Sequence, residues 1–121
     1  MKLSSNVHFL LGLHVQIKIN HWQTKGYARH NAFGGFYDTL DDLMDKFVEC
    51  AMGKYGRFVL DGEEKSIQLS NLSELNIPGL INTVRDAFVQ MELDPQDTDL
   101  LNIRDEMLGE LNKLSYLLTL E

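Results

Sequence analysis

The sequence contains one cysteine, no long apolar run and few basic residues. Because Cys50 has no partner for an internal disulfide, and the first residues carry no signal-peptide pattern, we expect a cytoplasmic protein. No apolar stretch approaches the ~20 residues that a membrane-spanning helix needs. The 11 Lys and Arg are outnumbered by 18 Asp and Glu, and the net charge of −7 disfavours direct binding of DNA phosphates. The same charge favours the attraction of cations.

Apolar residues recur at three- and four-residue steps along most of the chain, which is the spacing of amphipathic helices. This pattern predicts four helices, at residues 4–24, 30–54, 78–93 and 99–120, with Pro78 in a first turn and Asp97 or Thr98 as a cap. Residues 56–76 form the longest polar connection, in which 58–60 and 67–69 are candidate packed segments. We therefore expect one all-α domain over residues 1–121, a four-helix bundle with a long connection between its second and third helices.

The helix expected at residues 30–54 has an acidic side and an apolar side. At about 100° per residue, one stripe of acids follows an i, i+4, i+7, i+11 series: Asp38, Asp42, Asp45 and Glu49. The opposite side is apolar and is formed by Phe33, Phe36, Leu40, Leu43, Phe47 and Ala51. Only Lys46 offsets the acids, so a cation or a second subunit would relieve their repulsion. A simply solvated helix face is the plainer alternative.

The helix expected at residues 4–24 carries two histidines beside its apolar residues. His14 and His21 lie seven residues apart on this face, whereas Gln16 and Gln23 mark the side expected to face solvent. For His14 we expect a hydrogen-bonded core or interface role. His21 is different because His30 follows after a short loop, and histidine nitrogens together with helix carboxylates suit iron and other first-row transition metals.

Residues 10–55 resemble the Dps-type miniferritins, the small members of the ferritin-like superfamily. The resemblance rests on His21-Trp22, Lys25-Gly26 in a short loop, His30, Phe36-Tyr37-Asp38, and Asp45-x-x-x-Glu49. It implies a ferritin-like bundle in which His21 and His30 of one subunit and the two acids of its two-fold mate bind iron. The implied activity is Fe(II) oxidation by peroxide or oxygen, for iron storage or detoxification. The implied partners are copies of the same chain, in a two-fold dimer or a twelve-subunit shell.

The chain departs from the family's pattern at three points. Gly34 stands where another acid is common, which leaves Asp38 or Asp42 as candidate substitutes. The loop between the two histidines is shorter than is usual in the family, and the basic tail with which some members hold DNA is missing. The intrasubunit di-iron centre of larger ferritins is not expected, because it needs Glu-x-x-His on two helices and none occurs here.

Two other functions remain open from the sequence. A noncatalytic interaction protein that keeps a ferritin-like scaffold without the metal would account for Gly34 and the short loop. A MazG-like nucleotide pyrophosphohydrolase would use helix carboxylates to hold Mg²⁺ against phosphates, and residues 104–111, RDEMLGEL, faintly resemble its acidic helix. This second alternative leaves His21 and His30 without a role.

Overall fold

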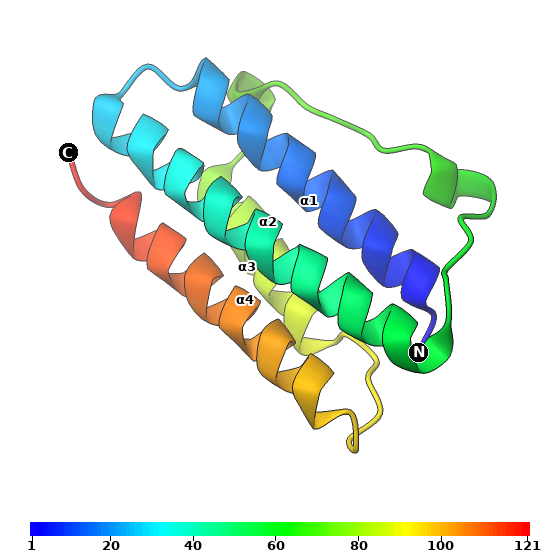
Figure 1. The fold of residues 1–121 in the computed structure, drawn as a ribbon. Helices are drawn as coiled ribbons and strands as arrows, with labels where there is room; N and C mark the ends of the chain where they lie inside the picture. The colour runs from blue at the N-terminus through cyan, green and yellow to red at the C-terminus, as the bar shows by residue number, and fades with distance from the viewer.

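The computed structural model describes residues 1–121 and contains four α-helices, two short 3₁₀ helices and no strand. The elements are α1 Leu3–Gln23, α2 Tyr27–Tyr55, η1 Gly62–Lys65, η2 Leu72–Glu74, α3 Ile77–Val89 and α4 Thr98–Leu117. Antiparallel α1 and α2 form one helical hairpin, and α3 and α4 form a second one beside it (Figure 1). The expected all-α, four-helix architecture with a long connection between α2 and α3 is confirmed. None of the helices combines the length and apolar character that crossing a bilayer requires.

The helix boundaries differ from the predicted ones mainly at the start of α2 and the end of α3. α2 begins at Tyr27, so its connection to α1 is only Thr24–Gly26. α3 stops at Val89 instead of residue 93, because the chain turns there and the Met91 amide donates to the Phe88 carbonyl. The start of α3 agrees with the prediction, since Pro78 lies in its first turn.

One apolar core joins all four helices. α1 contributes Leu10 and Ile17, and a Phe9–Phe88 contact, edge-on with ring centroids 5.2 Å apart, connects α1 to α3. α2 and α4 supply most of the remainder: Phe33, Phe36, Leu40, Met44, Phe47, Ala51, Leu100, Ile103, Met107, Leu111 and Leu114. Of the apolar side predicted for α2, only Leu43 is half-buried instead of buried. The four exposed acids of α2 lie on the opposite side, so their expected orientation away from the core is confirmed.

Residues 57–76 run alongside α1 as an extended strap (Figure 1). Side chains of α1 hold it at four points: Ser4 and Ser5 bond to Glu64, His8 to Ser66, Gln16 to Ser70, and Gln23 to Asn71 and Leu72. The Gln16 side chain accepts a hydrogen bond from the Ser70 amide (2.8 Å) and donates one to the Ser70 carbonyl (2.9 Å). The expectation that Gln16 faces solvent is therefore wrong: it is buried, because the strap covers that side of α1.

The two apolar pieces of the strap differ in burial. Within residues 58–60, Phe58 and Leu60 pack against the core, whereas Val59 is exposed. Within residues 67–69, Ile67 and Leu69 both remain exposed. Neither piece forms a helix or strand, so the strap depends on its polar anchors. Among these, burial would raise the pKa of Glu64, but Lys2, the Asp61 amide and the two serines lower it to about 2.

Asp97 ties the start of α4 to the end of α2. It occupies the N-cap position of α4, as predicted, but its side chain makes no capping bond. The buried carboxylate instead accepts hydrogen bonds from Lys54 and Tyr55 of α2. These two donors hold the pKa of Asp97 below its usual value, and the carboxylate raises the pKa of Lys54 and of Tyr55.

Replacement of Asp97 by Asn should lower the melting temperature at neutral pH, because it removes the charge that both donors face. Since the folded-state pKa is lowered, the stabilisation is complete above the ordinary value of 3.8 and is lost as pH falls through the folded-state value. Thermal unfolding followed by circular dichroism between pH 7 and pH 2 measures the effect. Asp99→Asn, in the exposed first turn of α4, is the control and should change little. Equal melting temperatures for both variants would contradict a structural role for Asp97.

Candidate metal site at the α1–α2 corner

His21 and His30 form a reciprocal pair where α1 passes into α2. His21 Nδ1 lies 2.7 Å from the His30 carbonyl oxygen, and His30 Nδ1 lies 2.9 Å from the His21 carbonyl oxygen. The two rings stack with centroids 3.8 Å apart and planes 22° apart. A carbonyl oxygen only accepts, so each Nδ1 must donate its proton and each neutral ring keeps a lone pair on Nε2. An Nδ1 anchored on a carbonyl is the arrangement that orients metal-binding histidines.

Local helix chemistry explains why the pair forms. The carbonyls in the last turn of a helix have no intrahelical partner, and His21 lies in the last turn of α1. The three-residue connection Thr24–Gly26 returns the chain so tightly that the His30 ring reaches this carbonyl. The sequence prediction that His21 and His30 come together is therefore met. The same contacts also have a structural effect, because they cap α1 and close the corner.

The stacking limits how the pair can bind metal. An imidazole lone pair lies in the plane of its ring, and these planes are nearly parallel. Metal–nitrogen bonds are about 2.1 Å long. The two Nε2 lone pairs therefore cannot both point at one ion at this distance. With the rings as they stand, each imidazole suits a separate ion.

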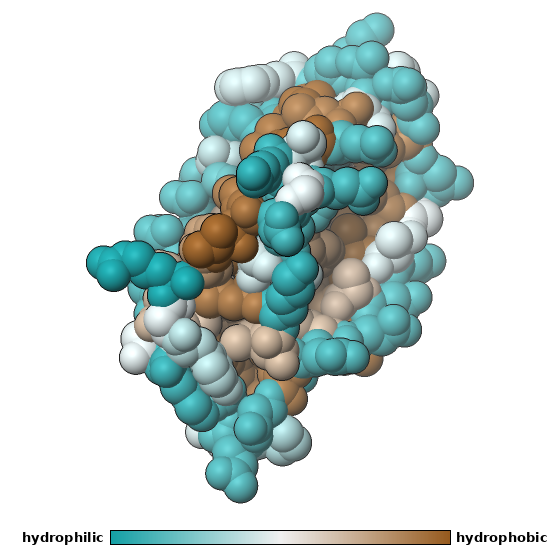
Figure 2. All heavy atoms as spheres, turned by 90° about the vertical axis from the view of Figure 1, so that its right-hand side faces the viewer, coloured by the Kyte–Doolittle hydropathy of each residue, from teal (hydrophilic) through white to brown (hydrophobic).

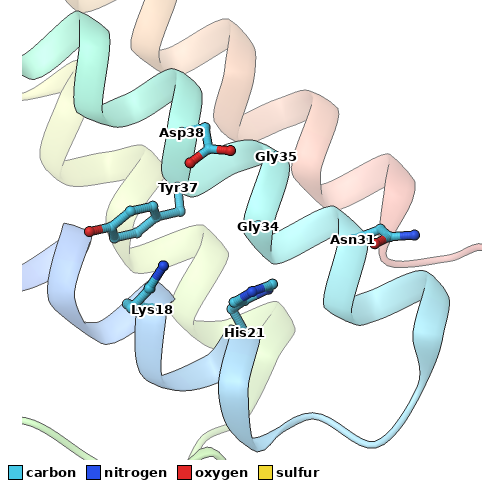
Figure 3. A pocket seen from close by; sticks show the side chains of 7 residues that line it. All are labelled: Lys18, His21, Asn31, Gly34, Gly35, Tyr37 and Asp38. Atoms are coloured by element: carbon cyan, nitrogen blue, oxygen red, sulfur yellow. The ribbon is translucent and has the colours of Figure 1, made fainter.

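Gly34 is required by the position of the His21 ring. A Cβ atom at residue 34 would lie 2.9 Å from His21 Cε1 and 3.0 Å from His21 Nδ1, closer than such atoms approach. The acid that the miniferritin pattern has here would collide with the ring in this arrangement. The same ring borders a cavity of about 300 Å³, which is lined by Lys18 and His21 of α1 and by Asn31, Tyr37 and Asp38 of α2 (Figure 3). Asp38 is thus the predicted carboxylate that shares a cavity with His21.

The other predicted acids lie away from the histidines of their own chain. Asp45 follows His30 by 15 residues and Glu49 by 19, which places them about 22 Å and 28 Å along α2. Asp42 is exposed and lies outside the cavity that His21 borders. No group of three or more His, Cys, Asp or Glu side chains comes together within one chain in a way that holds a metal ion. One chain therefore supplies a histidine pair with Asp38 nearby, but not the full predicted ligand set.

A second aromatic cluster lies next to this cavity, and the sequence did not predict it. His14 stacks on Tyr37 with centroids 3.9 Å apart, and Lys18 Nζ lies 4.3 Å from the Tyr37 ring centre and 5.3 Å from that of Trp22. His14, Lys18 and Trp22 follow an i, i+4, i+8 series, which is the signal that places them on one stripe of α1.

His14 is buried, as expected, but it is not fully hydrogen-bonded. Its Nε2 makes no hydrogen bond, although Asp41 Oδ1 lies 3.4 Å away. Burial lowers the pKa of His14, and Lys18 adds to this effect, whereas Asp41, the Tyr37 backbone and Asp38 oppose it. His14 is therefore held in its neutral form more strongly than a solvent-exposed histidine.

Comparison with known proteins gives a family and one relative, without a function. Residues 21–118 match a family described as a family of unknown function, DUF5856. The chain is also 30% identical over 101 residues to an uncharacterized 14.6 kDa protein of Enterobacteria phage T4, from the mobD-ri intergenic region. That alignment covers 84% of this chain and 75% of the phage protein. No solved structure matches the chain.

Gly34 and Gly35 provide a matched test of the histidine pair. Gly35→Ala meets no atom within 4 Å and should raise the free energy of unfolding by about 0.5–1 kcal/mol, because Ala is the better helix former. Gly34→Ala gains the same helix propensity but displaces the His21 ring, so we expect a net loss of stability and a broken bond to His30. Chemical denaturation and ¹⁵N NMR of the imidazoles measure both effects. A gain in stability for Gly34→Ala equal to that of Gly35→Ala would contradict this packing.

Acidification should destabilise the protein in part through His14. Its pKa is lower in the folded protein than the ordinary 6.5, so the unfolded chain binds more protons and stability falls as pH drops through this range. His14→Phe keeps an aromatic ring against Tyr37 and removes the titrating group. We expect a smaller decrease in melting temperature between pH 7.5 and pH 5.5 for this variant than for the native protein. His8→Phe, at a half-exposed position, is the control, and equal slopes for native and His14→Phe would contradict the assignment.

Proposed function

This chain belongs to DUF5856, a family of unknown function, and we propose that it binds Fe(II) and oxidises it at a site shared by two copies. The observation that carries the proposal is the His21–His30 pair, whose carbonyl-anchored Nδ1 atoms leave both Nε2 lone pairs for metal ions. The resemblance to Dps-type miniferritins supports it, and so does the net charge of −7. A cytoplasmic location, in which Fe(II) is available and Cys50 stays reduced, fits this reaction.

An antiparallel pairing of α2 with α2 of a second copy would complete the site. His30 lies near the start of α2, and Asp45 and Glu49 lie beyond its middle. A two-fold axis near residues 38–39 would bring those two acids of one copy opposite His30 of the other. In the same register, Asp42 of the second copy would approach Gly35 and the nearby His21, since no atom lies within 4 Å of the position that a side chain at residue 35 would take. Asp38 would lie near the axis, close to Lys18, which can offset its charge.

The proposed ligands suit iron in both oxidation states. Histidine nitrogens bind Fe(II), and carboxylates favour the harder Fe(III). A site with both kinds of ligand therefore favours oxidation of the bound iron. Two separate ions agree with the nearly parallel ring planes of the histidine pair. The balanced reaction is 2 Fe(II) + H₂O₂ + 2 H⁺ → 2 Fe(III) + 2 H₂O, in which each iron gives one electron to the peroxide. Iron is here the substrate, and the protein supplies the ligands and their spacing.

A noncatalytic ferritin-like interaction protein is the second candidate. The observation that favours it is the capping of α1 by His30, which gives the histidine pair a structural use without any metal. The steric exclusion of an acid at Gly34 points the same way. The MazG-like alternative gains no such support, because Arg104 of its acidic helix donates to the Phe88 carbonyl and pairs with Asp105.

Fe(II) binding under anaerobic conditions, followed by addition of peroxide, tests the proposal. We expect saturable binding and fast oxidation in the native protein, and loss of both in Asp45→Ala/Glu49→Ala. The control is Glu106→Ala/Glu110→Ala, which removes the same charge with the same spacing from α4 and should keep both activities. Absorbance of Fe(III), with the oligomeric state measured by light scattering, gives the result. The absence of saturable binding in the native protein would leave the noncatalytic scaffold.

A further inference from the structure

The side of the bundle between α1 and α3 is open. Close backbone approaches join α1 to α2, α2 to α4, and α3 to α4, but α1 and α3 do not approach each other in this way. The strap crosses the opening, held by hydrogen bonds to α1. Figure 2 looks onto the side of the molecule where the strap lies and shows recessed hydrophobic atoms on both sides of a hydrophilic band. Phe9 packs on Phe88 across this side, and the rest of the opening is bordered by the strap.

The space between α1, the strap and α3 is a cavity of about 750 Å³. Its apolar wall comes from α1, the strap and α3: Phe9, Leu13, Ile67, Leu75, Leu80 and Val84. Four of these six residues are only partly buried or exposed, so part of this apolar wall is accessible to a ligand. The cavity is open to solvent, and a cleft of several hundred Å³ with a mostly apolar lining is typical of small-molecule sites.

The polar groups around the cavity define the head group that it would accept. Glu63 is the acid in the lining, and no Lys or Arg side chain lines the cavity. The Nε2 of His8 and the amide of Gln16 are already engaged by the strap backbone, at Ser66 and Ser70. The remaining polar side chains, Ser66, Gln68 and Ser70, can both donate and accept hydrogen bonds, so Glu63 supplies the one formal charge in the lining.

We propose that this cavity binds a small amphiphile with an apolar body and a cationic amine head, with the body between α1 and α3 and the head at Glu63. The apolar wall excludes a purely polar ligand, because burying polar groups without partners is costly. The single acid disfavours an anionic head group by repulsion. This site is separate from the α1–α2 corner, and the proposal does not depend on iron binding.

Gly12 offers a way to close the cavity from α1. A Cβ atom at this position would meet only Ile67 Cγ2, at 3.9 Å, which is ordinary contact. Gly12→Ala therefore fits and serves as the control, whereas the longer side chain of Gly12→Leu enters the cavity. Glu63→Gln removes the charge while keeping the size of the side chain.

Calorimetric titration with decylamine, decanol and decanoate, each below its aggregation concentration, tests the proposal. We expect saturable decylamine binding, about tenfold weaker binding of decanoate, retention in Gly12→Ala, and loss in Gly12→Leu. In Glu63→Gln, decylamine should lose its advantage over decanol. Backbone NMR of the native protein locates the site without any variant, with the largest shifts expected at Phe9, Ile67 and Val84. The proposal would be overturned if decylamine did not bind, if the NMR shifts centred elsewhere, or if decanoate bound equally well. Dimerisation of the protein through this face, in place of ligand binding, would also overturn it.

Discussion

The exchange of hydrogen bonds between His21 and His30 is the constraint on which the α1–α2 hairpin depends. Each ring donates to the backbone of the other helix, so two helices joined by three residues are fixed in both distance and rotation. Residue 34 must then be glycine, because the His21 ring occupies the space of a side chain. The position of Asp38 follows as well, since rotation of α2 at the corner brings this acid to the cavity that Lys18 and His21 of α1 border.

Because of this constraint, the same two histidines can have a structural role and a metal-binding role at once. An imidazole whose Nδ1 is held by a carbonyl both caps a helix end and points a lone pair in a fixed direction. A pair of this kind needs no metal to be stable. It nevertheless gives a pre-oriented half of a metal site, and the other half lies about four helical turns or more along α2, out of reach within one chain.

Periodicity predicted the parts of the structure that depend on the burial of regular helices. The stripes of α2 and α4 are clear in the sequence because Phe33, Leu40 and Met107 repeat with the helical period and have only one way to be buried. The outward position of the acids follows from the same reasoning. The approach of His21 and His30 was predicted from a family resemblance and the short loop, which limits how far two residues can separate.

The remaining features depend on long-range contacts that leave no periodic signal. Gln16 looks like a solvent-facing residue on a helical wheel, yet it is buried because residue 70 of the strap lies over it. Asp97 was placed correctly as a cap position, but its partners are Lys54 and Tyr55, more than 40 residues earlier. The reason for Gly34 could not be predicted either, since a glycine in a helix does not show which side chain occupies the space beside it. Here the His21 ring occupies that space.

The strap has almost no spare chain between its first and last anchors. From Ser4 to Gln23, α1 advances about 28 Å at 1.5 Å per residue. The strap partners of these two residues, Glu64 and Leu72, lie eight residues apart and can span about 26–29 Å at most. η1 and η2 lie at the two ends of this stretch, so the chain between them is extended. Loss of a residue there would detach the strap from at least one anchor, which makes chain length as constrained on this side of the bundle as in the three-residue corner that holds the histidines.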